Sequence, residues 1–416
     1  MRVLPPLTLL ALSLGICLAC GSPGAAPAAA NEGAALDSGV DGAMDVDAID
    51  ADATGADAGV ATDATSPDVA GPEVASPDAV PSPLPVTLTE AIVSAAKAVL
   101  ADDPTRGLTL TIDVPGLGRW ATGIGLADAE QNLPMQGADH LRVGSITKTF
   151  VAAAVLRDVE AGKLSLDDSV APLLPAIQID PAITVRMLLG HRSGIFNYTD
   201  DANFLGQAKA AIAPAALYAG AAAHAPEFAP GTGYKYSNTN FIVLGMLLEK
   251  LHGVALHTWL RQTLWAPLQL KDVWFEGYEE LGLQHVAGYL AGQPALAYDT
   301  SWAWAAGALA ANGSDLCTWL RALYVDGTVL GATTVAAMVK PSPESKAAGD
   351  SYGLGTMIDP RGGRAVVGHT GSTMGFNGEV YIDRDSGICV AVLTNDFFGV
   401  RKAVARKVWD VLLAGL

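Results

Sequence analysis

The stretch from Leu141 to Leu156 most constrains the fold, because it joins a short apolar segment to a helix that must be buried. After Thr149 it reads Phe-Val-Ala-Ala-Ala-Val-Leu, which is rich in alanine and apolar nearly all round. A helix of this kind lies inside a domain rather than on its surface. The sequence therefore predicts a rigid central helix that starts near Ser145.

Ser145 and Lys148 lie at the start of this helix and are candidates for a nucleophile and its activator. Positions i and i+3 share one face of a helix, so the lysine amine comes within reach of the serine hydroxyl. Burial disfavours the ammonium form, which lets a buried lysine accept the serine proton. The helix N-terminus would also stabilise an oxyanion that forms beside Ser145.

A second Ser-x-x-Lys sequence, from Ser94 to Lys97, shows that the motif alone is a weak signal. Two fixed positions in four residues occur about once or twice by chance in a chain of this length. Ser94 lies mid-way along an amphipathic segment, Leu88 to Leu100, with no glycine turn before it. We interpret this second match as a chance occurrence, so the choice of Ser145 depends on the rest of the chain.

The chain has 416 residues, a net charge of −18 and 50% hydrophobic residues, enough for one large domain or two small ones. Residues 21–86 hold twelve acidic residues, no Lys or Arg, and no aromatic residue. Such a composition cannot bury enough apolar surface to fold, so we expect a disordered acidic linker. Neither this linker nor the remainder offers a basic patch, which argues against nucleic acid as a partner.

Residues 1–20 have the composition of an export signal. Arg2 precedes an uncharged, mostly apolar run that ends at Ala19 and is too short for a comfortable membrane span. The end of this run, Cys-Leu-Ala-Cys-Gly, resembles the lipobox of bacterial lipoproteins, in which the cysteine after a small residue is lipidated. We expect an exported protein of the cell envelope that is held to a membrane through Cys20. A plain signal peptide is the alternative.

Cys317 and Cys389 are the cysteines of the remaining chain. A disulfide is allowed in an oxidising compartment, but Cys389 lies in an apolar run that predicts a buried strand, and we favour free buried thiols. No cluster of His and Cys has metal-ligand spacing. We therefore expect no metal and no organic cofactor.

The order of elements predicts one antiparallel sheet built from both ends of the chain. The predicted strands are Leu108–Val114, Trp120–Leu126, Tyr352–Ile358, Arg364–His369, Gly378–Ile382 and Ile388–Thr394, with turns at Pro360–Gly363 and Asp383–Gly387. A final helix runs from about Val400 to Leu413, and an Ala- and Leu-rich helical stretch covers residues 166 to about 285. We expect an α/β (α+β) domain, residues 87–416, whose antiparallel sheet is flanked by helices and carries an inserted, mainly helical lobe. Ser145 would lie at the seam between sheet and lobe.

Two further motifs follow Ser145-x-x-Lys148 along the chain. Tyr236-Ser237-Asn238 lies in a turn-rich loop, and His369-Thr370-Gly371-Ser372 ends a predicted strand. In this order they resemble the motifs of the serine β-lactamase and penicillin-binding protein superfamily, in particular of class C β-lactamases and D-Ala-D-Ala carboxypeptidases. The segments Gly162–Asp168 and Leu188–Ile195 are also similar to that family, and the likeness covers about 330 residues. It implies the β-lactamase/transpeptidase-like fold.

The resemblance implies a role for each motif residue near Ser145. Lys148 and Tyr236 would handle the proton, because a phenol beside a cation ionises more easily. Asn238 would orient Lys148 and a substrate amide. Each residue also has a structural alternative: a half-buried loop tyrosine for Tyr236, and a helix cap for Asn238.

The later motif would bind the substrate. Gly371 permits a close backbone approach, and by resemblance the N–H of Ser372 joins that of Ser145 as an oxyanion hole. His369 stands where most β-lactamases carry a lysine, so its charge would change between pH 5.5 and 7.5. We expect pH-dependent attraction of a substrate carboxylate, with Thr370 supplying a hydroxyl contact.

Four other residues are weighed as structural. His191 is expected to hydrogen-bond within the protein rather than react. Trp302, Trp304 and Trp319 are more readily explained as core residues than as a pocket wall.

These observations predict an exported serine hydrolase that forms an acyl-enzyme with amide or ester substrates. Its nearest functional likeness is to D-alanyl-D-alanine carboxypeptidases, with an esterase or a class C-like β-lactamase as alternatives. A non-enzymatic alternative is an inactive protein that binds peptidoglycan or β-lactams. The expected partners are a small-molecule or peptide substrate, with peptidoglycan as one candidate.

Overall fold

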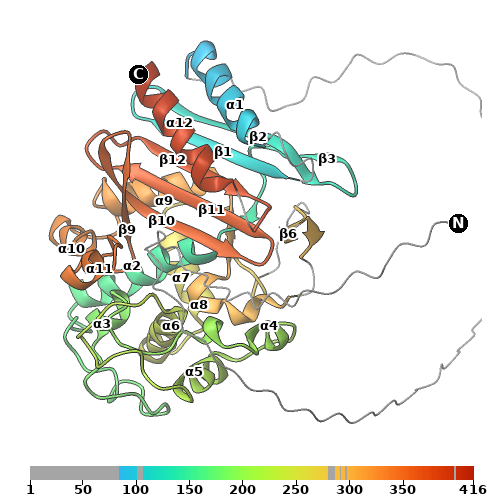
Figure 1. The fold of residues 1–416 in the computed structure, drawn as a ribbon. Coiled ribbons are helices and arrows are strands. Elements are labelled where there is room, and N and C mark those ends of the chain that lie inside the picture. The colour runs from blue at the N-terminus through green and yellow to red at the C-terminus, as the bar shows by residue number, and fades with distance from the viewer. Residues whose placement is uncertain (1–83, 101–105, 280–285, 291, 296–297, 398–399) are drawn as a thin grey trace, which may run out of the picture. The chain divides into compact units, whose positions relative to one another are not determined.

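A seven-stranded antiparallel sheet joins the two ends of the chain (Figure 1). The computed structural model describes residues 84–100, 106–279, 286–290, 292–295, 298–397 and 400–416. In sheet order the strands are β3 (Leu133–Pro134), β2 (Gly118–Asp128), β1 (Gly107–Val114), β12 (Cys389–Thr394), β11 (Phe376–Asp383), β10 (Arg364–Thr373) and β9 (Met357–Arg361). The strands from the N-terminal part (β1–β3) and those from the C-terminal part (β9–β12) meet where β1 pairs with β12, with Leu110 opposite Val392. The predicted antiparallel sheet from both chain ends is confirmed, and its first two predicted strands pair as a hairpin.

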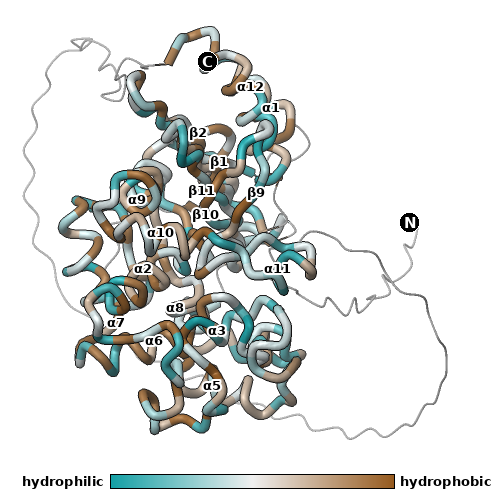
Figure 2. Tube along the Cα trace, turned by 90° about the vertical axis from the view of Figure 1, so that its left-hand side faces the viewer, coloured by the Kyte–Doolittle hydropathy of each residue, from teal (hydrophilic) through white to brown (hydrophobic). Residues whose placement is uncertain are grey.

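Helices cover both faces of the sheet, as the view turned by 90° shows (Figure 2). One face of β1, with Leu108, Leu110 and Ile112, packs against α1 (Val86–Leu100) and α12 (Arg401–Gly415). The other face packs against α9 (Gly313–Tyr324). Since successive strand side chains point to opposite faces, a sheet covered on both sides needs strands that are buried throughout.

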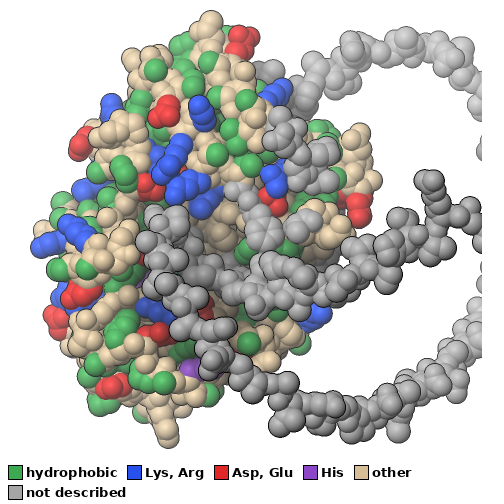
Figure 3. Space-filling model, viewed as in Figure 1, with side chains coloured by type: hydrophobic (Ala, Val, Ile, Leu, Met, Phe, Trp, Pro, Cys, Tyr) green, Lys and Arg blue, Asp and Glu red, His purple; other side chains and the backbone are tan. Residues whose placement is uncertain are grey.

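The C-terminal helix α12 is amphipathic, as predicted. Val404, Val408 and Leu412 recur every four residues and are buried against the sheet. Lys and Arg side chains gather over the part of the sheet that α12 covers (Figure 3). The helix therefore has an apolar inner face and a basic outer face.

The chain between β4 (Leu141–Arg142) and β8 (Leu309–Ala311) supplies the central helix and the inserted lobe. Its helices are α2 (Thr147–Glu160), α3 (Val185–Leu189), α4 (Phe204–Gln207), α5 (Pro214–Ala222), α6 (Asn238–His252), α7 (Leu256–Leu260) with a continuing turn Arg261–Trp265, and α8 (Trp304–Gly307). Short 3-10 turns occur at Gly144–Ile146 (η1), Tyr198–Asp200 (η2) and Thr300–Trp302 (η4). The central helix α2 is buried along most of its length, which confirms the prediction made from its composition.

The predicted helical stretch from 166 to about 285 is correct in kind and wrong in extent. Strand β5 (Val273–Phe275) interrupts it, and residues 280–285 lie outside the described residues. Helices continue beyond it as α8, α9, α10 (Ala332–Met338) and α11 (Pro343–Ala347). Strands β4, β8 and β5 form a second, three-stranded sheet. Strands of two or three residues are too short to show an alternating pattern, so the sequence did not predict them. The pair β6 (Tyr289–Leu290) and β7 (Gln293–Pro294) is equally short.

Strand β9, the first strand of the C-terminal part of the sheet, begins later in the chain than the sequence predicts. It starts at Met357 rather than Tyr352, and it includes Pro360, which the sequence predicts to lie in a turn. The turn itself is Gly362-Gly363, where both residues have positive φ (+52° and +79°). Proline is tolerated in β9 because this strand lies at the edge of the sheet.

The folded part begins slightly before the predicted boundary at residue 87. Leu84 is already buried with the residues of α1, so the end of the predicted linker belongs to the domain. The predicted export signal, Cys20 and residues 21–83 of the linker lie outside the described residues.

Cys317 and Cys389 are buried free thiols, as expected. In the part of the chain that the structure describes, no single helix is long and apolar enough to cross a membrane. One bent pair, Asn238–His252 with Leu256–Trp265, passes on length and composition alone.

Candidate active site

The candidate nucleophile follows a backbone turn that only glycine can make in this position. Gly144 has φ +51°, and a Cβ there would lie 2.8 Å from the backbone nitrogen of Ser372. A Cβ at Gly371 would lie 1.9 Å from the carbonyl oxygen of Val143 and 3.0 Å from the nitrogen of Ser145. The two glycines therefore allow the turn before α2 and strand β10 to touch through their backbones. This contact brings the N–H groups of Ser145 and Ser372 into the same small region.

Lys148 is fully buried and holds the Ser145 hydroxyl. Its Nζ lies 2.8 Å from Ser145 Oγ, 2.8 Å from Asn238 Oδ1 and 2.6 Å from the carbonyl oxygen of Ala306. Three acceptors match the three hydrogens of an ammonium group. The predicted i, i+3 contact is present: the ammonium form donates to Ser145 Oγ, and the amine can take the serine proton only when it is neutral.

Asn238 is the first residue of α6, and its side chain belongs to the site rather than capping the helix. Its Oδ1 faces Lys148, and its Nδ2 donates to Thr199 Oγ1 at 3.2 Å. Its backbone N–H donates to Asn197 Oδ1 at 2.9 Å. These contacts decide which end of the amide faces the lysine.

Tyr236 lies beside the amine, as its motif predicted. Lys148 Nζ is 5.0 Å from the centre of the phenol ring and lies over its face. On its other sides the ring packs against His191, Tyr352 and His369, with ring centres 4.2, 5.9 and 6.4 Å away. The tyrosine is therefore half-buried and held by aromatic neighbours next to the Ser145–Lys148 pair.

His369 does not behave as the sequence predicted. Burial, together with the charge of Lys148, lowers the pKa of His369 to about 3, and the side chain has no exposed surface. Its Nδ1 is 2.5 Å from the carbonyl oxygen of Thr370, and its Nε2 is 3.1 Å from the hydroxyl of Tyr352. The expectation of a charge that changes between pH 5.5 and 7.5 is wrong, because the imidazole stays neutral over that range.

The residues that follow His369 in β10 lie in two different environments, one against β9 and one in the pocket. Thr370 is buried and its hydroxyl donates to Met357 Sδ at 3.5 Å, so it binds β9 in this structure. Ser372 and Thr373 line the pocket beside Ser145. A carboxylate contact through Thr370 would need its hydroxyl to turn from Met357.

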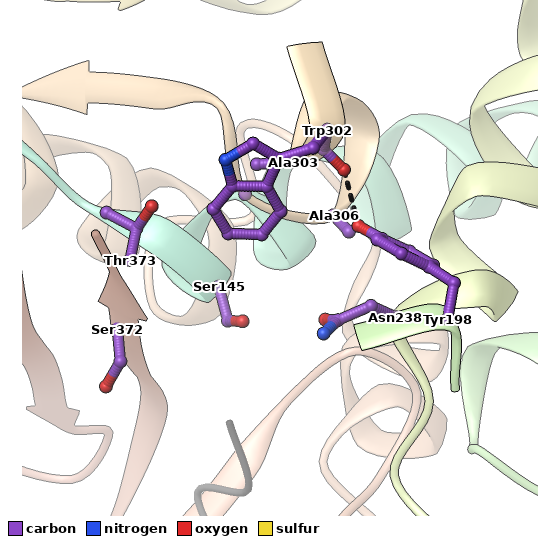
Figure 4. A pocket seen from close by; sticks show the side chains of 9 residues that line it. Ser145, Tyr198, Asn238, Trp302, Ala303, Ala306, Ser372 and Thr373 are labelled. Atoms are coloured by element: carbon purple, nitrogen blue, oxygen red, sulfur yellow. Dashed lines mark hydrogen bonds between the residues drawn. The ribbon is translucent and has the colours of Figure 1, made fainter. Parts of the chain in front are cut away.

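The pocket beside Ser145 is narrow and uncharged (Figure 4). Its lining residues are Ser145, Tyr198, Asn238, Trp302, Ala303, Ala306, Gly307, Ser372 and Thr373. The hydroxyl of Ser145 and the amide of Asn238 point toward each other across it, and the rings of Trp302 and Tyr198 form a wall (Figure 4). The Tyr198 hydroxyl donates to the Trp302 carbonyl at 2.6 Å, which ties the lobe to the chain before α8.

Of the three weighed tryptophans, Trp302 lines the pocket while Trp304 and Trp319 are buried in the core. Trp319 stacks on Phe150 of α2 with ring centres 4.1 Å apart. His191 hydrogen-bonds internally, as expected: its Nδ1 accepts from the backbone N–H of Ser237 at 3.2 Å.

Sequence reasoning missed two contributors to the site. The carbonyl of Ala306 and the ring of Tyr198 come from segments without a motif. A backbone carbonyl leaves no signal in a sequence. In the structure, Trp304 at the start of α8 has a φ of +29°, which is rare for a bulky residue, and Ala306 follows it in the same helix.

Among the described residues, no group of three or more His, Cys, Asp or Glu side chains could hold a metal ion. The site therefore consists of Ser145 hydrogen-bonded to a buried lysine, at the junction of an antiparallel sheet and a helical lobe. Together with the fold it defines the β-lactamase/transpeptidase class.

The comparison with known proteins agrees with this class. The family model described as Beta-lactamase matches residues 92–414, so the chain belongs to that family. The solved D-stereospecific amidohydrolase from a Streptomyces species is 30% identical, with a TM-score of 0.69 and coverage of 79% of this chain and 99% of that one. The D-amino acid amidase from Ochrobactrum anthropi SV3, complexed with L-phenylalanine amide, is 26% identical, with the same TM-score and coverage of 79% and 98%.

A D-aminopeptidase of Cereibacter sphaeroides is 27% identical over 279 residues, which cover 65% of this chain and 53% of that protein. This chain thus spans about half the length of the curated relative that it matches.

Proposed function

We propose that the chain is a serine hydrolase that cleaves the amide bond of a D-amino acid amide or a short D-peptide through an acyl-enzyme on Ser145. The observation that carries this proposal is the 2.8 Å contact between Lys148 Nζ and Ser145 Oγ inside a buried site. The substrate class is supported by the printed names of three relatives: a D-stereospecific amidohydrolase, a D-amino acid amidase and a D-aminopeptidase.

The geometry supports acyl transfer in two halves. Ser145 Oγ attacks the substrate carbonyl carbon while its proton passes to the Lys148 and Tyr236 pair. The N–H groups of Ser145 and Ser372 would stabilise the oxyanion of the tetrahedral intermediate. The C–N bond then breaks, and the leaving amine takes the proton. A water molecule hydrolyses the resulting ester by the same steps and frees Ser145.

The uncharged pocket favours an amidase over a D-alanyl-D-alanine carboxypeptidase. A carboxypeptidase must accept a substrate whose leaving group carries a carboxylate, and buried charges need a partner. Among the residues that the structure describes, no cation lines the pocket itself: Lys148 lies behind Ser145 and Asn238 with three acceptors already around its Nζ, and His369 is neutral. We therefore place the carboxypeptidase second, and an esterase or a β-lactamase after it.

We also propose, from the sequence of residues 1–20 alone, that the protein is exported and anchored in the cell envelope through Cys20. Peptidoglycan fragments would then be within its reach. Recovery of a wild-type protein without lipid on Cys20 would contradict the anchor.

The test uses the two Ser-x-x-Lys serines as a matched pair. Wild-type protein, Ser145→Ala and Ser94→Ala are incubated with D- and L-phenylalanine amide and with an activated ester, followed by assay of ammonia and intact mass. We expect Ser145→Ala to lose the adduct and to fall on the order of 10⁴-fold or more in turnover. Ser94 and Lys97 are exposed on α1, so Ser94→Ala should match the wild type.

Three results would contradict the proposal in different ways. An adduct on Ser94 would overturn the choice of nucleophile. Turnover of the activated ester alone would favour the esterase. Binding of labelled penicillin without any adduct or turnover would favour the inactive binding protein.

A further inference from the structure

Tyr352 lies outside every motif of the sequence, yet its backbone is fixed next to the site. The residue follows α11 and is almost fully buried. Its N–H donates to Ser345 Oγ at 3.3 Å, and its carbonyl accepts from the same hydroxyl at 3.1 Å. Ser342 N–H donates to that carbonyl at 3.3 Å. A buried serine therefore contacts both backbone polar groups of Tyr352 and sets the position of its ring.

The hydrogen bonds of His369 determine which nitrogen carries the proton. A carbonyl oxygen can only accept, so the 2.5 Å contact with the carbonyl of Thr370 requires a hydrogen on Nδ1. The imidazole is neutral at physiological pH, so Nε2 has a lone pair. The Tyr352 hydroxyl, 3.1 Å away, must then donate to Nε2. The Thr370 carbonyl thus selects the tautomer, and the Tyr352 hydroxyl, by donating to the lone pair on Nε2, holds the ring of His369 in one orientation.

The imidazole of His369 lies between Tyr236 and the backbone of β10 that precedes Ser372. Its ring centre is 6.4 Å from that of Tyr236, and its Nδ1–H binds the carbonyl just before Gly371. That carbonyl belongs to the Thr370–Gly371 peptide group, and the next peptide group along β10 carries the Ser372 N–H. Because the imidazole is held at both nitrogens, it helps to fix the position of the Tyr236 phenol relative to the Ser372 N–H.

We propose that Tyr352 is a positioning residue of the acyl-transfer site, acting through the neutral Nδ1–H tautomer of His369. The inference rests on the proposed function for its kinetic consequence only, because the tautomer is a property of the substrate-free protein. Loss of the hydroxyl leaves Nε2 buried without this donor. The ring can then turn or exchange its proton, and both Tyr236 and β10 lose a fixed neighbour.

Tyr324 provides a matched control. It is also a buried tyrosine, and its hydroxyl lies 2.7 Å from Thr356 Oγ1. It belongs to α9, and neither it nor Thr356 lines the pocket beside Ser145. Tyr352→Phe and Tyr324→Phe each remove one buried hydroxyl and one hydrogen bond, so each should destabilise the fold to a similar degree.

The test compares these two variants with the wild type in three measurements. Nitrogen NMR of protein labelled with ¹⁵N-histidine reports the His369 tautomer without substrate. We expect one protonated Nδ1 in the wild type and in Tyr324→Phe, and shifted or broadened signals of both ring nitrogens in Tyr352→Phe. With D-phenylalanine amide we expect kcat to fall about 10- to 100-fold in Tyr352→Phe, with KM nearly unchanged. Tyr324→Phe should keep the wild-type kcat.

The third measurement, the unfolding midpoint in denaturant, separates positioning from simple destabilisation. Unchanged histidine signals in Tyr352→Phe, or equal losses of kcat in both variants at equal stability, would overturn the proposal. Should the wild type show no hydrolysis at all, the proposed function fails while the NMR comparison still decides the role of Tyr352.

Discussion

Lys148, the proposed partner of Ser145 in proton transfer, is held by three acceptors that come from three parts of the chain. Lys148→Ala and Tyr236→Phe should each slow acylation by about 10² to 10⁴, the usual range for a lost general base. The exposed Lys97 of the second Ser-x-x-Lys sequence is the control, and Lys97→Ala should leave the rate unchanged. Stopped-flow measurement of adduct formation gives the rates. Near-normal acylation in both site variants would show that another group moves the proton.

His369 should make the protein sensitive to acid. The pKa of His369 is about 3 in the folded protein, against about 6.5 when unfolded, so between these values only the unfolded chain binds the proton. Stability is therefore retained above pH 6.5 and lost as pH falls below it. From pH 7 to pH 5 this histidine alone should lower the free energy of unfolding by about 2 kcal/mol.

The measurement is denaturant unfolding of the wild type and of His369→Asn at both pH values. Asparagine removes the titration while keeping a side-chain donor for the Thr370 carbonyl. We expect the difference between the two proteins to change by about 2 kcal/mol across the range. A difference that stays constant would show that the pKa of His369 in the folded protein is close to the ordinary value of about 6.5, as the sequence alone suggested.

At the scale of elements, we expect catalysis to depend on how closely β10 approaches the start of α2. Gly371→Ala should push them apart, because the added Cβ would lie 1.9 Å from the carbonyl oxygen of Val143. We expect a loss of about 1–3 kcal/mol in stability and on the order of 10²-fold in kcat, since the oxyanion donors move. Gly206→Ala, in α4 with no atom near the new Cβ, is the control and should change neither. Full activity of Gly371→Ala would mean that the strand can shift without cost.

At the scale of the whole molecule, the folded domain should work without most of residues 1–83. A chain that begins at residue 82 keeps Leu84, and we expect the wild-type kcat and unfolding midpoint. A chain that begins at Thr87 loses the buried Leu84 and the Pro85 carbonyl, which accepts from the N–H groups of Leu88 and Thr89. It should be less stable by about 2–4 kcal/mol, measured by denaturant unfolding. Reduced activity of the longer of these two chains would assign a role to the tail.

The sequence by itself determined the features that depend on short separations along the chain. The contact of Ser145 with Lys148 follows from helical spacing, and the paired strands follow from local patterns. The resemblance of the three motifs to one family predicted that these distant segments lie together around Ser145. The family is shown by the match over residues 92–414, and the antiparallel sheet with its inserted lobe is confirmed.

Only the tertiary structure decided the surroundings of these motifs. The carbonyl of Ala306 reaches Lys148 from 158 residues away, and the hydroxyl of Tyr352 binds a histidine that the motif predicted to change its charge near neutral pH. Hydrogen-bond partners and pKa values depend on which distant groups are packed around a side chain and on how much water they exclude. Those neighbours come from segments without a pattern of their own. Local spacing in the sequence therefore indicates the candidate nucleophile, whereas folding sets the charge of the groups around it.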